Sequence, residues 1–139
     1  MKSLITIGLI GLFSLVCLNA SAQYGKLVSD SNKTFVDTVT NTATKTQFIK
    51  ITGYQDVITI QANIEKISGT VAGSVWVSGS IDGSYYQSIS DTLTATNVAK
   101  QSRIWTFNPS LYSYYKVNYK GSGTMSAKLS SFAIWRKKR

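Results

Sequence analysis

Apolar and polar residues alternate through most of the sequence after Ala22, and this period of two restricts the chain to extended strands. In residues 57–65 the apolar side chains fall on one side and the polar ones on the other. The apolar members are Ile58, Ile60, Ala62 and Ile64. Such a pattern is typical of an antiparallel strand with one buried and one solvated face. Thr, Ser, Val, Ile and Tyr are frequent and only one proline occurs, which also favours strands over helices.

The same alternation predicts the other strands. They cover residues 34–40, 45–52, 74–81, 84–90, 103–107, 113–120 and 124–135. Asp82-Gly83 is a preferred pair for a two-residue type I′ turn, so the strands on either side of it should form a tight hairpin.

The last predicted strand changes phase. Its first half places Met125, Ala127 and Leu129 on one face, and its second half places Phe132 and Ile134 there. This shift predicts a β-bulge near Ser130-Ser131.

Seven to nine short strands with a turn every eight to twelve residues predict an all-β domain. We expect a single antiparallel β-sandwich of the jelly-roll or immunoglobulin-like kind, with a closed barrel as the alternative. The expected organisation is a signal peptide over 1–22, a polar and loose N-terminal arm over 23–33, the sandwich over 34–135 and a basic tail over 136–139.

The first 22 residues have the features of an export signal. Lys2 is followed by an apolar stretch over 4–18, and Ala20-Ser21-Ala22 matches the small-x-small site before Gln23. A membrane anchor is the alternative, but the apolar stretch of about 15 residues is shorter than the ~20 that a spanning helix needs. We therefore expect a secreted, periplasmic or cell-surface protein.

Composition excludes several kinds of chemistry. The sequence has no histidine, and its one cysteine, Cys17, lies in the export signal. The mature chain can therefore form no disulfide, no Ser-His-Asp or Cys-His centre and no ordinary zinc site. Six carboxylates remain, and none lies in a recognisable catalytic or calcium-binding pattern. We predict a non-enzyme without cofactor or metal; a glycan hydrolase is the least favoured alternative.

Positive charge is concentrated at the C-terminus. The formal net charge is +9, and the chain ends in Arg136, Lys137, Lys138 and Arg139. This tail is a candidate contact for an anionic surface or an acidic protein partner. The alternative is a solvated tail without a partner, and nucleic-acid binding ranks lowest because it conflicts with export.

Tyrosines are concentrated in one part of the chain. Six of the eight lie between Tyr85 and Tyr119 and, with Trp76 and Trp105, they can form either an exposed platform or part of the core. Exposed aromatic rings bind sugar faces and protein partners with little loss of side-chain entropy. Alternation favours the core for Tyr85, Tyr115 and Tyr119. The candidate binding residues are Tyr86, Tyr112 and Tyr114.

Three segments, in this order, resemble a recurring pattern in small β-sandwich proteins of bacterial phages, among them head-decoration and tail-associated virion proteins. The segments are residues 37–45, 67–86 and 114–125. Because an export signal departs from that pattern, the resemblance allows a phage-encoded exported protein, a membrane-associated virion protein or a bacterial homologue outside the cell.

The sequence thus predicts a non-enzymatic, exported structural or binding module. The favoured hypothesis is a phage-type surface or virion-associated protein that contacts a capsid or a cell surface. The alternative is a secreted bacterial carbohydrate-binding or adhesin module that binds a surface glycan. The oligomeric state is left open.

Overall fold

The structure is a computed structural model that describes residues 28–29, 36–53 and 55–136. These residues form ten strands and no helix, so none of them lies in a helix long and apolar enough to cross a membrane. The predicted signal peptide and Lys137–Arg139 lie outside the described residues.

Seven of the ten strands are five or more residues long, and three are short. In chain order they are β1 (Val28–Ser29), β2 (Val36–Thr40), β3 (Thr44–Lys50), β4 (Val57–Gly69), β5 (Gly73–Ser80), β6 (Gln87–Ser88), β7 (Leu93–Ala95), β8 (Lys100–Phe107), β9 (Tyr114–Gly121) and β10 (Met125–Arg136). Within the predicted loose N-terminal arm, β1 pairs with β3, so the arm is attached to a sheet at this point.

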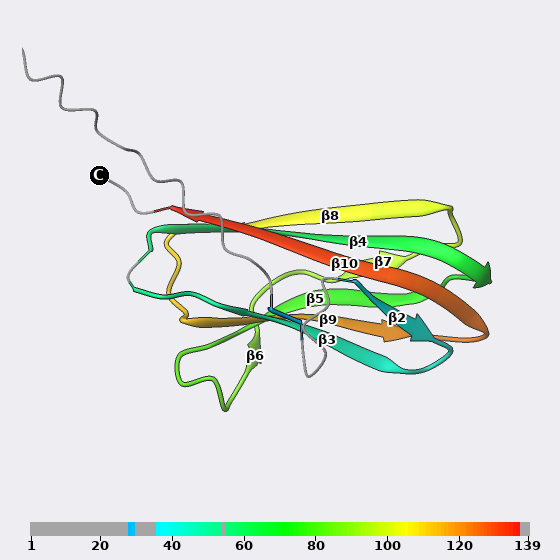
Figure 1. The fold of residues 1–139 in the computed structure, drawn as a ribbon, viewed down its shortest axis with the longest axis horizontal. Coiled ribbons are helices and arrows are strands. Elements are labelled where there is room, and N and C mark those ends of the chain that lie inside the picture. Colours follow the sequence, from blue (N-terminus) through cyan, green and yellow to red (C-terminus); the bar gives the residue numbers. More distant parts are fainter. Residues whose placement is uncertain (1–27, 30–35, 54, 137–139) are drawn as a thin grey trace, which may run out of the picture.

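The strands form two open antiparallel sheets (Figure 1). The six-stranded sheet has the order β1-β3-β9-β5-β6, and β7 also pairs with β5. The four-stranded sheet has the order β2-β10-β4-β8. In Figure 1 strands β8, β4 and β10 of the four-stranded sheet lie above β5, β9 and β3 of the six-stranded sheet, and β6 and the loop before it extend below them. The prediction of a β-sandwich is confirmed, and the closed barrel is not observed.

The core lies between the sheets and follows the predicted alternation. In β4, Ile58, Ile60, Ala62 and Ile64 are buried, as the pattern predicts. They face the buried residues of β5 and β9 in the other sheet, among which are Val75, Val77, Tyr115, Val117 and Tyr119. Each large apolar side chain that is fully buried stabilises the fold by roughly 1.5–3 kcal/mol, so a chain without disulfides is held together by this layer.

The bulge predicted near Ser130-Ser131 is wrong. Strand β10 alternates without interruption, so Ser131 points into the core while Phe132 and Ile134 are about half exposed. The register between β10 and β4 shifts instead between Ser126 and Ala127, where Ile67 of β4 has no partner.

A buried polar cluster explains why Ser131 is tolerated inside the sandwich. The Ser131 hydroxyl donates to Gln47 Oε1 at 2.6 Å and also contacts the Tyr119 hydroxyl. Tyr119 donates to the backbone oxygen of Ser130 at 3.2 Å, and burial raises the pKa of its hydroxyl, which stays a donor. Hydrogen bonds therefore offset the desolvation of Ser131, and the strand keeps its phase.

The tight hairpin predicted at Asp82-Gly83 is also wrong. Gly79 pairs with Gln87, and residues 81–86 form a wider loop between β5 and β6. Gly83 has the expected positive φ of 79°, but Asp82 does not have a positive φ. The Asp82 carboxylate accepts hydrogen bonds from the amides of Ser84 and Tyr85, which gives the backbone an alternative to ladder pairing.

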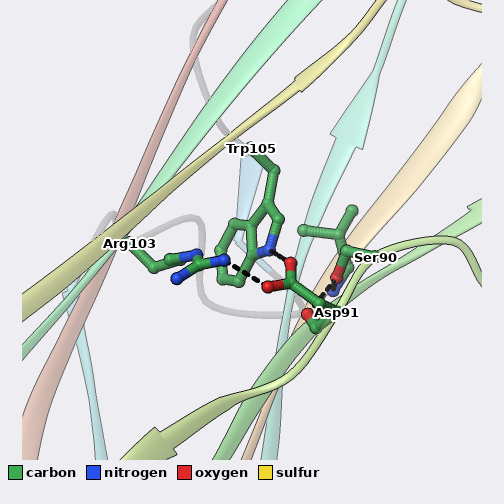
Figure 2. A network of polar contacts seen from close by, with 5 residues as sticks. Ser90, Asp91, Arg103 and Trp105 are labelled. Carbon is green, nitrogen blue, oxygen red and sulfur yellow. Dashed lines mark hydrogen bonds and ion pairs between the residues drawn. The ribbon is translucent and has the colours of Figure 1, made fainter.

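A second polar network joins the two sheets at one edge (Figure 2). The Asp91 carboxylate, which precedes β7, accepts a hydrogen bond of 2.7 Å from Trp105 Nε1 and pairs with Arg103. Both partners lie on β8 of the four-stranded sheet, and the neighbouring Ser90 hydroxyl accepts from the amide of Val77 in β5. The connection from β6 to β7 is thereby fixed against both layers. Trp105, a candidate for an exposed platform, is buried here.

Candidate functional site

Four half-buried aromatic side chains gather on the outer face of the six-stranded sheet. We call this surface the aromatic face; its rings are Phe48 of β3, Trp76 of β5, Tyr114 of β9 and Tyr86 of the loop before β6. The outward direction of the three rings on strands follows from alternation, because Ile49, Val75 and Tyr115 beside them are buried in the core. The strands bring together rings that lie 66 positions apart in the sequence.

The loop over residues 81–86 is folded back onto this face. Ser78 and Ser80 point outward from β5, yet both are buried because the loop covers them. The Ser80 hydroxyl donates to Asp82 at 2.8 Å and accepts from the amide of Gly83 at 2.9 Å. Hydrogen bonds from the amides of Ser84 and Tyr85 lower the pKa of the Asp82 carboxyl, so it is charged at neutral pH.

Lys116 lies at the centre of the aromatic face. Its register partners are Phe48 on β3 and Ser78 on β5. The Lys116 ammonium is 3.5 Å from the centre of the Tyr86 ring and 4.8 Å from that of Phe48. The Phe48 and Tyr86 rings also meet edge to face, with centroids 6.4 Å apart. One cation therefore holds two rings in fixed positions.

Tyr114 is held in a similar way at the end of the face. Its ring lies 5.6 Å from the Lys50 ammonium, and Lys50 is its register partner on β3. On the loop side Gly83 approaches so closely that an added Cβ would lie 3.2 Å from the Tyr114 ring. Partial burial raises the pKa of the Tyr86 hydroxyl, and the Asp82 carboxylate adds to this shift, so this phenol is a hydrogen-bond donor at neutral pH.

A row of polar side chains crosses the sheet next to the rings. Asn118 Nδ2 donates to the Ser78 hydroxyl at 2.9 Å, and the Thr46 hydroxyl is 3.5 Å from Asn118 Oδ1. Asn118 is also the register partner of Trp76. The aromatic face thus combines flat apolar surface with fixed amide and hydroxyl groups.

The predicted tyrosines are divided between this face and the interior. Tyr86 and Tyr114 lie on the aromatic face, whereas Tyr112 packs against the core, with its ring edge to face with Tyr115 at 5.9 Å. The expectation of a core position is confirmed for Tyr115 and Tyr119 and is wrong for Tyr85, which is 86% exposed. Tyr85 lies in the loop that the tight-hairpin prediction had placed in a strand.

Of the basic tail, the structure describes Arg136. It is the last residue of β10 and is exposed, and its backbone oxygen accepts from the amide of Asp56 at 3.0 Å. Lys137, Lys138 and Arg139 lie outside the described residues, so their predicted contact with an anionic surface stays a prediction.

The outer face of the four-stranded sheet has a different character. A hollow of about 350 Å³ lies over β4, β8 and β10, and its lining contains no aromatic residue. Its charged groups pair with one another, since Glu65 lies 3.2 Å from Lys100 and 4.0 Å from Lys128. Within the described part of the chain, no group of three carboxylates is placed to hold a metal ion.

Sequence reasoning missed Phe48, Lys50 and Lys116. The alternation of residues 44–50 places Phe48 and Lys50 opposite the buried Ile49, which was a usable sign of outward position. No local pattern shows that β3 pairs with β9, and this pairing brings Phe48 next to Lys116.

Comparison with known proteins gives fold similarity without sequence similarity. No protein-family model matches the sequence, and no curated protein matches it. A structure of CBM4, a carbohydrate-binding module, matches with a TM-score of 0.51 and 9% identity over 73% of this chain and 71% of that one. The enzymatically active domain of bacteriophage CBA120 tailspike protein 4 matches with a TM-score of 0.51 and 10% identity over 72% of this chain.

These matches establish the β-sandwich fold and nothing about the ligand, because the identities are so low. The chain spans about 15% of the tailspike chain. A CBM22-1 xylan-binding domain from Paenibacillus barcinonensis Xyn10C also matches, at 8% identity over 86% of this chain and all of that one, with a TM-score of 0.46.

Proposed function

We propose that this protein is a glycan-binding module and that its ligand lies across the aromatic face. The observation that carries the proposal is the set of four half-buried rings that lie on one sheet face beside a row of amide and hydroxyl groups. A sugar ring has apolar C–H faces and a polar rim. It therefore requires both flat aromatic surface and nearby hydrogen-bond partners.

The fixed geometry of the face favours binding. Lys116 and Lys50 lie over three of the four rings and hold them in place. The hydrogen bonds of Ser80 and Asp82 fix the loop over residues 81–86. Because these side chains are ordered before the ligand arrives, less conformational entropy is lost on binding. The similarity to a carbohydrate-binding module agrees in fold with this proposal.

Direct binding measurements test the proposal. Purified protein is applied to a glycan array and the strongest polysaccharide is titrated by calorimetry. Phe48→Ala and Trp76→Ala should each weaken binding by about tenfold, because a stacked ring contributes roughly 1–1.5 kcal/mol. Phe132→Ala, which removes a ring from the outer face of the other sheet, is the matched control and should leave the affinity unchanged.

Two results would overturn the proposal. One is the absence of binding to every glycan tested. The other is loss of binding in the Phe132 variant with full binding in the Phe48 and Trp76 variants.

We further propose that the module acts outside the cytoplasm, because residues 1–22 have the features of an export signal. The N-terminal sequence of protein from the culture medium or periplasm should begin at Gln23. The virion-associated role implied by the resemblance stays a prediction, and gene neighbourhood tests it: capsid and portal genes favour that role, and glycan-degradation genes favour the glycan-binding module.

A further inference from the structure

We infer that the polysaccharide bound by the aromatic face is anionic, carrying carboxylate or sulfate groups; the inference rests on the proposed glycan-binding function. It starts from three lysines on that face, Lys50, Lys116 and Lys120. No carboxylate occupies a described outward position on β3, β5 or β9, so nothing on these strands neutralises the lysines.

The partners of these lysines differ from those of other basic side chains. Among the described residues, the ion pairs join Lys45 to Asp37, Lys100 and Lys128 to Glu65, and Arg103 to Asp91. Lys50 and Lys116 contact aromatic rings instead, and none of the three lysines on the face forms an ion pair with a described carboxylate.

The acidic group nearest in sequence to the face is already engaged. Asp82, in the loop over residues 81–86, accepts hydrogen bonds from the amides of Ser84 and Tyr85 and from the Ser80 hydroxyl. These bonds lie within the loop or join it to the end of β5, so Asp82 fixes the loop, and it forms no ion pair with any lysine in the described part of the chain. With three lysines and this one carboxylate, the face keeps a net positive charge for a ligand.

The spacing of the lysines matches an extended ligand. Lys50 on β3 pairs with Tyr114, the first residue of β9, and Lys116 and Lys120 lie further along β9. Residues that pair across the sheet form one row. At about 3.4 Å per residue, the rows of Lys50 and Lys120 are roughly 20 Å apart, with the aromatic rings between them. A polymer of several sugars can lie on the rings and place acidic substituents near successive lysines.

Burial of a neutral glycan on this face would remove water from cations without offering them a counter-charge, which is unfavourable. An acidic polysaccharide supplies that charge and keeps the sugar faces that the rings require. Uronic-acid polymers and sulfated polymers both have acidic groups and sugar faces, and the experiment compares the two classes.

Matched polymers test the inference. Polygalacturonate is compared with its methyl ester, and dextran sulfate with dextran, because each pair shares one backbone and differs in charge. At least one anionic member should bind more tightly than its neutral partner. Its affinity should fall as salt rises, since the Debye length shrinks from about 10 Å at 0.1 M to about 3 Å at 1 M.

Lysine variants test whether the preference for anionic polymers depends on the lysines of the aromatic face. Lys50→Gln with Lys120→Gln should weaken anionic binding by about 2–30-fold, because two exposed ion pairs of roughly 0.2–1 kcal/mol each are removed. Lys116 is left intact because it holds the loop. Lys100→Gln with Lys128→Gln, which removes the paired cations of the other sheet, should change little.

The outcomes separate the two proposals. If neutral polymers bind through Phe48 as tightly as anionic ones, the charge inference is overturned and the glycan-binding function stands. If neither anionic polymer binds, the charge inference is overturned, and the glycan array alone decides the glycan-binding function. If duplex DNA binds more tightly than any anionic polysaccharide and depends on the same lysines, the ligand class is wrong.

Discussion

The outer faces of the two sheets both carry lysines on outward strand positions, but these lysines have different partners. On the four-stranded sheet Lys100 and Lys128 lie beside Glu65, and the hollow between them has no aromatic lining. On the six-stranded sheet Lys50 and Lys116 lie against rings. On one face two lysines share a carboxylate, and on the other the lysines form no ion pair with a described carboxylate.

The difference shows how one β-sandwich acquires two unlike surfaces. Alternation gives each sheet an outer face, but it does not decide which side chains meet there. The pairing of β3 with β9 places Phe48 beside Lys116, while the pairing of β4 with β8 places Glu65 beside Lys100. Cross-strand pairs of this kind are the unit from which a sheet surface is built.

The largest expected effect tests whether the loop over residues 81–86 belongs to the aromatic face. Gly83→Val places a β-branched residue at a φ of +79° and pushes its Cβ against the Tyr114 ring. We expect the free energy of unfolding to fall by about 1–3 kcal/mol in chemical denaturation.

Gly123→Val is the matched control for this change. Gly123 has a φ of +75°, but no heavy atom lies within 4 Å of an added Cβ. The control therefore reports backbone strain alone, and the additional loss in the Gly83 variant reports the contact with Tyr114. Equal losses in the two variants would show that the loop does not press on the ring.

A second test concerns the division between inner and outer faces of β10. Ser131→Ala removes the hydroxyl that joins Gln47 to Tyr119 and should destabilise the protein by about 1–2 kcal/mol. Ser126→Ala, at an outward position of the same strand, should change the free energy of unfolding by less than about 0.5 kcal/mol. The reverse order would mean that β10 has the opposite phase.

A third, smaller effect compares the two settings of lysine directly. Lys116→Met removes a half-buried cation that lies over two rings, and should lower the free energy of unfolding by about 1 kcal/mol. Lys100→Met removes an exposed ion pair and should cost only about 0.3 kcal/mol. Hydrogen exchange of the amides in residues 81–86 should accelerate in the first variant alone. Equal losses of unfolding free energy and equal exchange rates in the two variants would contradict the distinction between the two faces.

The smallest effect depends on pH. The folded pKa of Asp82 lies below its ordinary value of 3.8, so its hydrogen bonds stabilise the loop above about pH 4. This contribution is lost as the pH falls through the folded pKa. The amide signals of Ser84 and Tyr85 should therefore shift below pH 4 in NMR spectra and stay constant between pH 5 and 8. Asp82→Asn should abolish the transition, and a transition that persists in this variant would assign it to another group.

The sequence predicted the secondary structure and fold class well where period-two alternation was regular. Residues 57–65 and 113–120 gave both the strands and their buried faces, because burial requires apolar side chains at every second position. Prediction failed at Ser131, where polarity indicated an outward position. The hydrogen bonds that offset its burial come from Gln47 and Tyr119, which no local pattern connects to it.

The candidate site was predicted only in part, because local patterns do not show which distant residues meet. Alternation and composition made Tyr86, Tyr112 and Tyr114 the candidate binding tyrosines, and the structure brings Tyr86 and Tyr114 to one face. It also places Tyr112 against the core, where its ring meets Tyr115. Tyr85 lies in solvent, because a side-chain network around Asp82 replaced the expected hairpin.

By itself the sequence determined that the chain forms strands, that one face of each strand is buried, and that residues 23–139 contain neither cysteine nor histidine. Tertiary structure alone decided which lysines meet a carboxylate and which meet an aromatic ring. The physical reason is that alternation is a property of each strand, whereas the composition of a surface depends on strand order and register, and these are set by contacts between residues far apart in the chain.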